Sequence, residues 1–388
     1  MKICILTPRY PLPEAGGDLL RINNIARYLR SQGHQLVLVS YTESDPDLEL
    51  GATVYDKIYT VRRSKWDSLF YSALFVIKGH PIQSGYYYSK RYLRLFREVI
   101  QKEKPDLYIS HLARMVPFID EVGVVDKTIV EMTDALSKTY VLASGAKGSW
   151  LKRFMYSIEK HLIGRYELDI VKRFRKVVLV SQSDVDYLQK KLGAPVPSLA
   201  MHTNGVDLST VQRKDYDVNK ICYIGNMVSL QNQDAAIYFA DEILPLILKE
   251  KPDTHFYIVG NNPPKTIQEL GERKNITVTG FVDDLHGFVS DSCLAVAPIR
   301  IAAGIQNKVL VAMACKIPVV LTSLIAVPIP ELKNGENCFI CEDADGIARR
   351  CIELMENLEQ RAEMAEKGYE MVRNHYTWEA KLRGYEFF

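Results

Sequence analysis

The stretch Ala297–Pro318, APIRIAAGIQNKVLVAMACKIP, determines the fold of the second half of the chain. It follows an apolar run, 293–297, with the composition of a buried strand, and Gly304 then opens a tight turn. From Gln306 to Ala314 the apolar residues recur with helical spacing, and small residues lie where a helix would press on a sheet. The sequence therefore predicts a strand, a glycine loop and a helix, which together form the repeating unit of an α/β sheet.

A helix that starts directly after a glycine loop presents free backbone N–H groups and the positive end of its dipole. Such a helix end suits a phosphate group, and Lys308 in the first turn would add a full positive charge. The alternative is an ordinary strand-to-helix connection that binds no ligand. Both interpretations are compatible with this segment taken by itself.

Strands and helices alternate along the whole chain. The expected strands are 3–7, 35–40, 107–110, 128–132 and 176–180, and then 220–225, 255–260, 276–280, 294–297 and 319–322. Apolar strands joined by helices indicate parallel sheets with both faces covered. Because the pattern starts afresh near residue 204, we predict an α/β fold with two Rossmann-like, doubly wound domains, 1–203 and 204–371. A C-terminal helix of about 372–388 is expected to pack back on the first domain.

The length of 388 residues fits two domains, and an apolar content of 47% is enough for two packed cores. No apolar run approaches the ~20 residues that span a bilayer. The N-terminus enters a strand directly and lacks the cleavage site of a signal peptide. Seven scattered cysteines indicate reduced thiols, with Cys338 and Cys341 as two packing residues, so we expect a cytoplasmic protein.

The net charge of +2 argues against a nucleic-acid-binding protein, but the charge is unevenly distributed. Residues 1–203 hold 30 Lys and Arg against 21 Asp and Glu, a balance of +9, and the remainder is −7. Much of the basic excess lies in two aromatic-rich segments, 62–97 and 147–176. They suit peripheral contact with the inner face of a membrane, or else they are solvated helices whose aromatic residues face the core.

Glycines follow the expected strands in both halves. Gly16 and Gly17 come after the first strand, and Gly225, Gly260, Gly280 and Gly304 lie at successive strand ends of the second domain. Ligands of open parallel sheets bind at the carboxyl ends of the strands, so two facing sheets would place a cleft between the domains. The four glycines of one domain therefore predict a cradle for a nucleotide or a phosphate.

Together these segments resemble the retaining nucleotide-sugar glycosyltransferases of the GT-B fold, family 4. The matching motifs cover nearly the whole chain and include Gly16-Gly17-Asp18, Gly33-His34, Asn204-Gly205-Val206-Asp207, Ile224-Gly225-Asn226-Met227, the run 278–283 and the run 304–310. The resemblance implies transfer of a sugar from a nucleoside-diphosphate sugar, a UDP-sugar by preference, with retention of anomeric configuration. The implied acceptor is lipid-linked or a polysaccharide, as in the assembly of exopolysaccharides and envelope glycans.

The resemblance also implies roles for the donor-binding positions. Gly225 and Asn226 would approach the diphosphate through the backbone, and Phe281 and Val282 would hold the base. At the helix start, Gly304, Ile305, Gln306 and Asn307 would direct N–H groups at the diphosphate. Gly16 and Gly17 would close a loop against donor and acceptor.

In the first domain the implied catalytic residue is His111, which would lie beside the transferred sugar. In the second domain Lys308 would act on the leaving phosphate. A satisfied polar residue at a strand end is the alternative for His111. Asp134 would contact a sugar or acceptor hydroxyl, with a structural cap as the alternative. Arg9 is expected on the acceptor side, where it would help to offset the diphosphate charge.

The chain departs from the family at two places. Many members carry two glutamates seven residues apart, where this chain has Ala303 and Val311. Valine cannot accept hydrogen bonds from the ribose hydroxyls, as the second glutamate does. Members also often place Arg and Lys in the loop after Gly225, where this chain has asparagines, so Lys308, with Arg300 or Arg9, would have to offset the diphosphate charge.

We expect neither a metal nor a cofactor. Asp45-Pro-Asp47 lies in a polar loop, and Asp184-Val-Asp186 lies in the first turn of a helix that Ser183 is expected to cap, where acidic residues complement the dipole. In the expected mechanism the acceptor hydroxyl attacks from the side of the leaving group, and the departing phosphate takes its proton. Two alternatives remain, a GT-B nucleotide-sugar epimerase or phosphorylase, and a sugar-nucleotide-binding protein without turnover.

Overall fold

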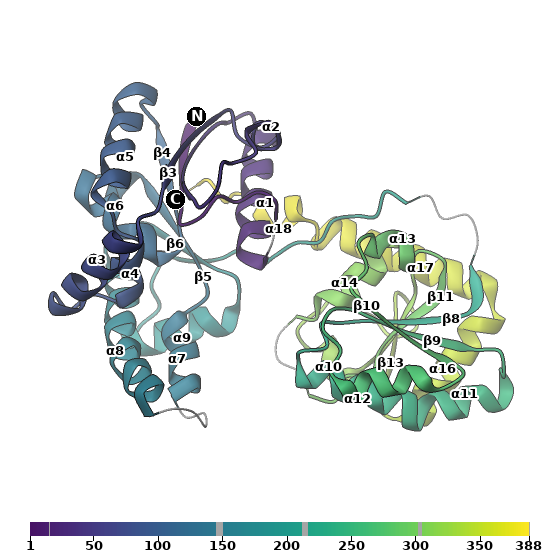
Figure 1. The fold of residues 1–388 in the computed structure, drawn as a ribbon. Helices are drawn as coiled ribbons and strands as arrows, with labels where there is room; N and C mark the ends of the chain where they lie inside the picture. Colours follow the sequence, from purple (N-terminus) through teal and green to yellow (C-terminus); the bar gives the residue numbers. More distant parts are fainter. Residues whose placement is uncertain (15, 145–149, 212–215, 302–304, 388) are drawn as a thin grey trace. The chain divides into compact units, whose positions relative to one another are not determined.

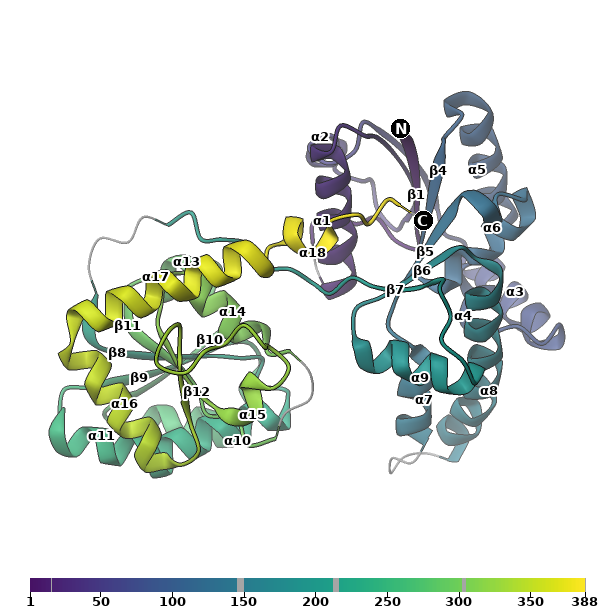
Figure 2. The ribbon, with the colours of Figure 1, turned by 180° about the vertical axis from the view of Figure 1, so that it is seen from behind.

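The computed structural model describes residues 1–14, 16–144, 150–211, 216–301 and 305–387. The chain divides into two compact units. The first unit consists of Met1–Asn204 and Leu382–Phe388, and the second of Gly205–Lys381. Figure 1 shows that each unit is a twisted sheet with helices on its two faces, and Figure 2 shows the same arrangement from behind.

In the described part of the first unit, seven parallel strands form a sheet in the order β3-β2-β1-β4-β5-β6-β7. The strands are β1 (Lys2–Thr7), β2 (Gln35–Thr42), β3 (Lys57–Arg62), β4 (Leu107–His111), β5 (Thr128–Thr133), β6 (Lys176–Leu179) and β7 (Leu199–Met201). The helices are α1 (Gly17–Ser31), α2 (Leu48–Ala52), α3 (Lys65–Ile77), α4 (Ile82–Tyr87), α5 (Lys90–Glu103), α6 (Val116–Val122), α7 (Leu136–Ser144), α8 (Trp150–Arg173) and α9 (Gln182–Leu192).

In the described part of the second unit, six parallel strands form a sheet in the order β10-β9-β8-β11-β12-β13. The strands are β8 (Asp217–Ile224), β9 (His255–Val259), β10 (Ile276–Gly280), β11 (Ser292–Ala297), β12 (Val319–Thr322) and β13 (Phe339–Cys341). The helices are α10 (Leu230–Tyr238), α11 (Leu244–Glu250), α12 (Lys265–Gln268), α13 (Leu285–Val289), α14 (Asn307–Ala314), α15 (Ser323–Ala326), α16 (Ala344–Glu356), α17 (Leu358–His375) and α18 (Trp378–Leu382), whose last residue belongs to the first unit.

The predicted fold class, two doubly wound α/β sheets, is confirmed. The central strands are buried on both faces because apolar residues fill them, as in β11, where all six residues are buried. Each unit has a core of its own, formed by these strands and the inward faces of the helices. All seven cysteines are buried, including Cys338 and Cys341, and none of them forms a disulfide bond in the described structure.

The C-terminal segment returns to the first unit later than expected. Residues 372–381 belong to the second unit, because Val372 and Tyr376 are buried in its core. From Leu382 onward the chain belongs to the first unit, where Tyr385 is fully buried. The expected return at about residue 372 was therefore ten residues too early.

The described side chains of the two basic aromatic segments differ in their exposure. In 147–176, residues 147–149 and the side chains of 150–158 lie outside the described part. Tyr166 and Phe174 are buried in the core, so neither ring is available for contact with a membrane. In 62–97, α5 also buries its aromatic rings, whereas α3 leaves several apolar side chains exposed. None of the described helices is both long enough and apolar enough to cross a membrane.

Candidate functional site

A pocket of about 300 Å³ lies at the carboxyl ends of three neighbouring strands of the second unit. Gly225 and Asn226 follow β8, Gly260 follows β9, and Phe281 and Val282 follow β10. Ile224, Val259, Asn261 and Leu285 complete the lining. Four of the residues predicted to bind the donor, Gly225, Asn226, Phe281 and Val282, thus meet at one cavity.

The floor of this pocket requires two glycines in contact. Gly260 has φ +153°, and a Cβ atom there would lie 1.8 Å from the carbonyl oxygen of Gly225. The backbone N–H of Gly225 donates to the carbonyl oxygen of Val259 at 2.9 Å, which fixes the first turn after β8. Without side chains, the two turns leave the backbone accessible to a ligand that approaches the strand ends.

We expect Gly260→Ala to lower the free energy of unfolding by at least about 2 kcal/mol more than Gly335→Ala does. Both glycines have positive φ, +153° and +77°, but a Cβ atom at Gly335 would meet nothing within 4 Å. The difference between the two variants therefore isolates the clash with Gly225. Urea unfolding of both proteins measures it, and equal losses would show that the two turns move apart at little cost.

Phe281 is an exposed residue of the pocket wall, with 69% of its surface accessible. Val282 and Leu285, by contrast, pack against the core of the unit. An aromatic ring with an accessible face is suited to stacking on a planar ligand group. This arrangement is compatible with the predicted role of Phe281 and Val282 toward a nucleotide base.

Lys308, in the first turn of α14, is connected to this pocket through one side chain. Its Nζ donates to the side-chain oxygen of Asn232 and, at 3.2 Å, to the hydroxyl of Tyr223. The amide nitrogen of Asn232 donates in turn to the carbonyl oxygen of Asn226 at 2.8 Å. The ammonium group therefore lies one residue behind the pocket wall.

The charge of Lys308 is not compensated by an acidic residue. Burial lowers the pKa of Lys308 to about 8, and within the described ranges no carboxylate forms an ion pair with it. Its partners, an amide oxygen and a hydroxyl, are both neutral. A partly buried cation without a counterion is costly in the free protein and favours the binding of an anion.

The other predicted residues of the helix start take different positions. Gln306 is the N-cap residue of α14 and is buried, while Asn307 is exposed. Ile305 and Val311 are partly buried and pack against the core. Gly304 lies outside the described residues, as does Ala303. Arg300, a candidate for offsetting phosphate charge, pairs instead with Asp234 at 2.7 Å.

In the first unit the turn after β1 brings together Gly16, Arg9 and Asp18. Gly16 is the N-cap residue of α1 with φ +134°, and Gly17 is the first residue of that helix. Arg9 donates from Nη2 to the carboxylate of Asp18 at 2.6 Å. Arg9 also lines a cavity of about 500 Å³ with four tyrosines, Tyr10, Tyr41, Tyr86 and Tyr87.

His111, the last residue of β4, is fully buried, and neither of its ring nitrogens has a hydrogen-bond partner among the described residues. Burial lowers the pKa of His111 to about 3, so the ring is neutral at physiological pH. Within the described part of the chain, the structure thus gives no support to the alternative of a satisfied polar residue at a strand end. An unsatisfied buried imidazole calls for an explanation, and a ligand hydroxyl would be a suitable partner.

The backbone next to His111 is strained. Leu112 has φ +71° and Thr133, at the end of the neighbouring strand β5, has φ +68°. Non-glycine residues with such positive φ angles cost about 1–3 kcal/mol each and occur often at functional sites.

The backbone N–H of Asp134 donates to the carbonyl of Met132, and burial, followed by the charge of Asp184, raises the pKa of the Asp134 carboxyl.

A buried network next to His111 was not predicted. Arg21 on α1 forms two hydrogen bonds with Glu131 on β5, from Nε at 2.9 Å and from Nη2 at 3.1 Å, and both side chains are fully buried. The hydroxyl of Tyr385 donates to the same carboxylate at 2.9 Å, and Arg21 also donates to Asn204. Glu131 lies opposite His111 in the sheet.

Comparison with known proteins gives a partial family match and many similar folds. Residues 218–357 match the family described as glycosyl transferases group 1. A relative from Klebsiella pneumoniae, an uncharacterized 44.6 kDa protein in the cps region, is 23% identical over 389 residues and aligns over 97% of this chain and 96% of its own.

Two solved structures illustrate the similarity of fold. Anabaena Alr3699/HepE in complex with UDP is 13% identical, with a TM-score of 0.60 over 99% of this chain and 98% of that chain. A TarM variant from S. aureus, in complex with Fondaparinux, alpha-GlcNAc-glycerol and UDP, is 14% identical, with a TM-score of 0.62 and the same coverage. The family match covers residues 218–357, and the solved structures show that the chain as a whole shares their fold.

Proposed function

We propose that this chain transfers a sugar from a UDP-sugar to a lipid-linked or polysaccharide acceptor, with retention of anomeric configuration. The observation that carries the proposal is the glycine-floored pocket with the uncompensated Lys308 one residue behind its wall. The uridine would stack on Phe281, and the diphosphate would lie over Gly225 and Asn226. The complexes of Anabaena Alr3699/HepE and S. aureus TarM with UDP support this choice of nucleotide.

In this reaction the bond between the anomeric carbon and a phosphate oxygen breaks, and negative charge grows on the departing diphosphate. Donors that are already in place stabilise such charge best. Lys308 and the N–H groups at the start of α14 would do so without a metal ion. The acceptor hydroxyl would attack from the side of the leaving group and give its proton to the departing phosphate, while the neutral ring of His111 would hold a sugar hydroxyl.

A donor screen tests this proposal. The full chain is incubated with a set of nucleoside-diphosphate sugars, with and without lipid-linked and oligosaccharide acceptors, and free nucleoside diphosphate is measured. The proposal predicts release that needs both a UDP-sugar and an acceptor, and that falls in Lys308→Met. Conversion of a UDP-sugar without any acceptor would indicate an epimerase instead, and UDP binding without release in any mixture would indicate a binding protein.

The affinity for UDP is expected to fall with rising pH because of Lys308. Its pKa in the free protein is about 8, and a bound diphosphate should raise that value, so the complex keeps a proton that the free protein loses. The Kd should therefore be about tenfold larger at pH 9 than at pH 7. Calorimetric titrations at both values measure this change, and the same pH dependence in Lys308→Met would assign it to another group.

We expect Val311→Glu to tighten UDP binding about tenfold, because a carboxylate could accept hydrogen bonds from the ribose hydroxyls. Val311→Leu is the matched control, since leucine keeps the apolar contact with the core but accepts no hydrogen bond. The Kd values of the three proteins for UDP decide the matter. Unchanged or weaker binding in Val311→Glu would mean that other residues have taken over the ribose.

A further inference from the structure

Helix α3 exposes an apolar stripe on its outer face. Trp66 and Ile77 are each 82% exposed, Leu69 is 68% and Phe70 is 64% exposed. Their spacing of three, four and seven residues places them along one side of the helix. Few surface helices leave four large apolar side chains in water, so this stripe indicates a binding surface.

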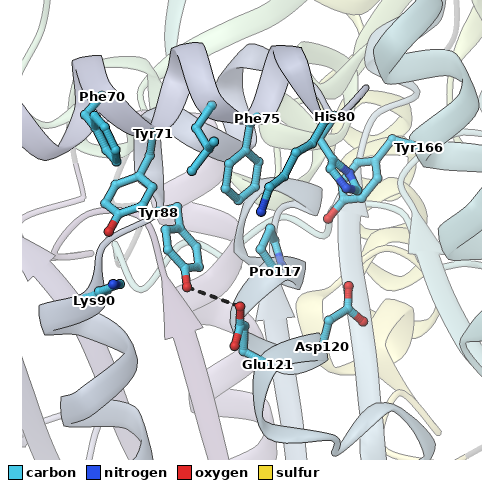
Figure 3. A pocket seen from close by; sticks show the side chains of 12 residues that line it. Phe70, Tyr71, Phe75, His80, Tyr88, Lys90, Pro117, Asp120, Glu121 and Tyr166 are labelled. Carbon is cyan, nitrogen blue, oxygen red and sulfur yellow. Dashed lines mark hydrogen bonds between the residues drawn. The ribbon is translucent and has the colours of Figure 1, made fainter.

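The other side of α3 covers a pocket of about 750 Å³. Figure 3 shows Tyr71 and Phe75 above the pocket, with Tyr88 and Pro117 below them and Tyr166 beside His80. Phe70 belongs both to the exposed stripe and to the pocket lining, so the two apolar surfaces are continuous.

The charges around this pocket favour an anionic partner. Lys78 and Lys90 lie on its rim, and neither forms an ion pair within the part of the chain that the structure describes. The two acidic residues of the lining are already engaged, Asp120 with Arg173 at 2.6 Å and Glu121 with the hydroxyl of Tyr88 at 3.3 Å. Segment 62–97 as a whole holds eight Lys and Arg and one Asp.

We propose that α3 docks on an anionic lipid surface. The stripe of Trp66, Leu69, Phe70 and Ile77 enters the interface between headgroups and chains, and Lys78 and Lys90 take lipid phosphates at the pocket rim. Tryptophan and a basic flank are typical of helices that lie in such an interface. A second copy of the chain fits less well, because self-pairing of the stripe would bring two strongly basic surfaces together. This inference is independent of sugar transfer.

Vesicle co-sedimentation of the full chain tests the proposal. Vesicles of three parts phosphatidylcholine to one part phosphatidylglycerol should bind the protein, and vesicles of phosphatidylcholine alone should bind it at least tenfold more weakly. Trp66→Ser combined with Ile77→Ser should reduce binding at least tenfold, as should Lys78→Gln combined with Lys90→Gln. The matched control combines Val327→Ser with Leu358→Ser, two residues of the second unit that are 81% and 62% exposed, and should bind as the parent does.

A second measurement places the helix in the lipid. Lipids with brominated acyl chains should quench part of the tryptophan fluorescence of the parent protein. This quenching should be absent in Trp66→Phe. Binding that survives the loss of Trp66 and Ile77, or that is equal on neutral vesicles, would overturn the proposal. So would a dimer in sedimentation velocity that the same double variant abolishes. The double variant should bind UDP as the parent does, so failure here is separate from failure of the proposed function.

Discussion

Arg21→Met is expected to destabilise the first unit by about 3–5 kcal/mol. The side chain of Arg21 is fully buried and makes two hydrogen bonds to Glu131, which is also fully buried. The variant leaves a carboxylate without its counterion, and its remaining partners among the described residues are the hydroxyl of Tyr385 and, through a long contact, Thr133. An unpaired charge in a buried site is among the largest single costs that a substitution can cause.

Urea unfolding followed by circular dichroism measures this loss in the free energy of unfolding. Two further variants serve as controls. Arg62→Met removes an exposed ion pair with Asp45 and should cost less than about 0.5 kcal/mol. Adding Glu131→Gln to Arg21→Met removes the stranded charge and should restore about half of the stability. If Arg21→Met costs no more than Arg62→Met, the buried pair contributes nothing to the fold.

Lys308→Met is expected to weaken UDP binding by about ten- to a hundredfold, the effect of losing one hydrogen bond to a charged group. The same change should stabilise the unligated protein, by about 1–2 kcal/mol, because it removes a partly buried cation that pairs with no carboxylate of the described chain. Asn232 keeps a donor in the variant, since the hydroxyl of Tyr223 also reaches its side-chain oxygen at 3.2 Å. A residue that costs stability and strengthens ligand binding is characteristic of a functional site.

Calorimetric titration with UDP and thermal unfolding without it measure the two effects. Arg62→Ala is the control, because it removes an exposed cation of the first unit and should leave the UDP affinity unchanged. Equal affinities of the parent and Lys308→Met would contradict the role of this lysine. Lower stability of Lys308→Met would contradict the account of its charge.

The sequence was sufficient for the fold because burial on both faces makes central strands continuous apolar runs. β1, β4, β8 and β11 were predicted within two or three residues for this reason. The edge strands β3, β7 and β13 were missed because their cues are weaker: β3 is only partly buried, and β7 and β13 have three residues each, whereas the edge strand β10 was predicted. Capping residues were also misplaced, since Ser181 and not Ser183 caps α9, where two serines two residues apart give the same local signal.

The candidate site was predictable only where its residues come directly after a strand. The resemblance to the family implied the roles of Gly225, Asn226, Phe281 and Val282, and because all four follow strands, the geometry of the sheet brings them together. The contact between Lys308 and Asn232 depends on side-chain conformations that no spacing specifies. The pair of Arg21 and Glu131 joins residues 110 positions apart, and neither residue belongs to a local motif. A buried ionic network of this kind can be identified only from the folded structure, because its residues are distant in the sequence.

Hydrogen exchange with and without UDP tests the central claim most directly, because it reports where the nucleotide binds. The account predicts that UDP slows exchange in peptides covering the turns after β8, β9 and β10, at residues 224–227, 259–262 and 280–283, and at the start of α14. Unchanged exchange in these four segments at saturating UDP would contradict it.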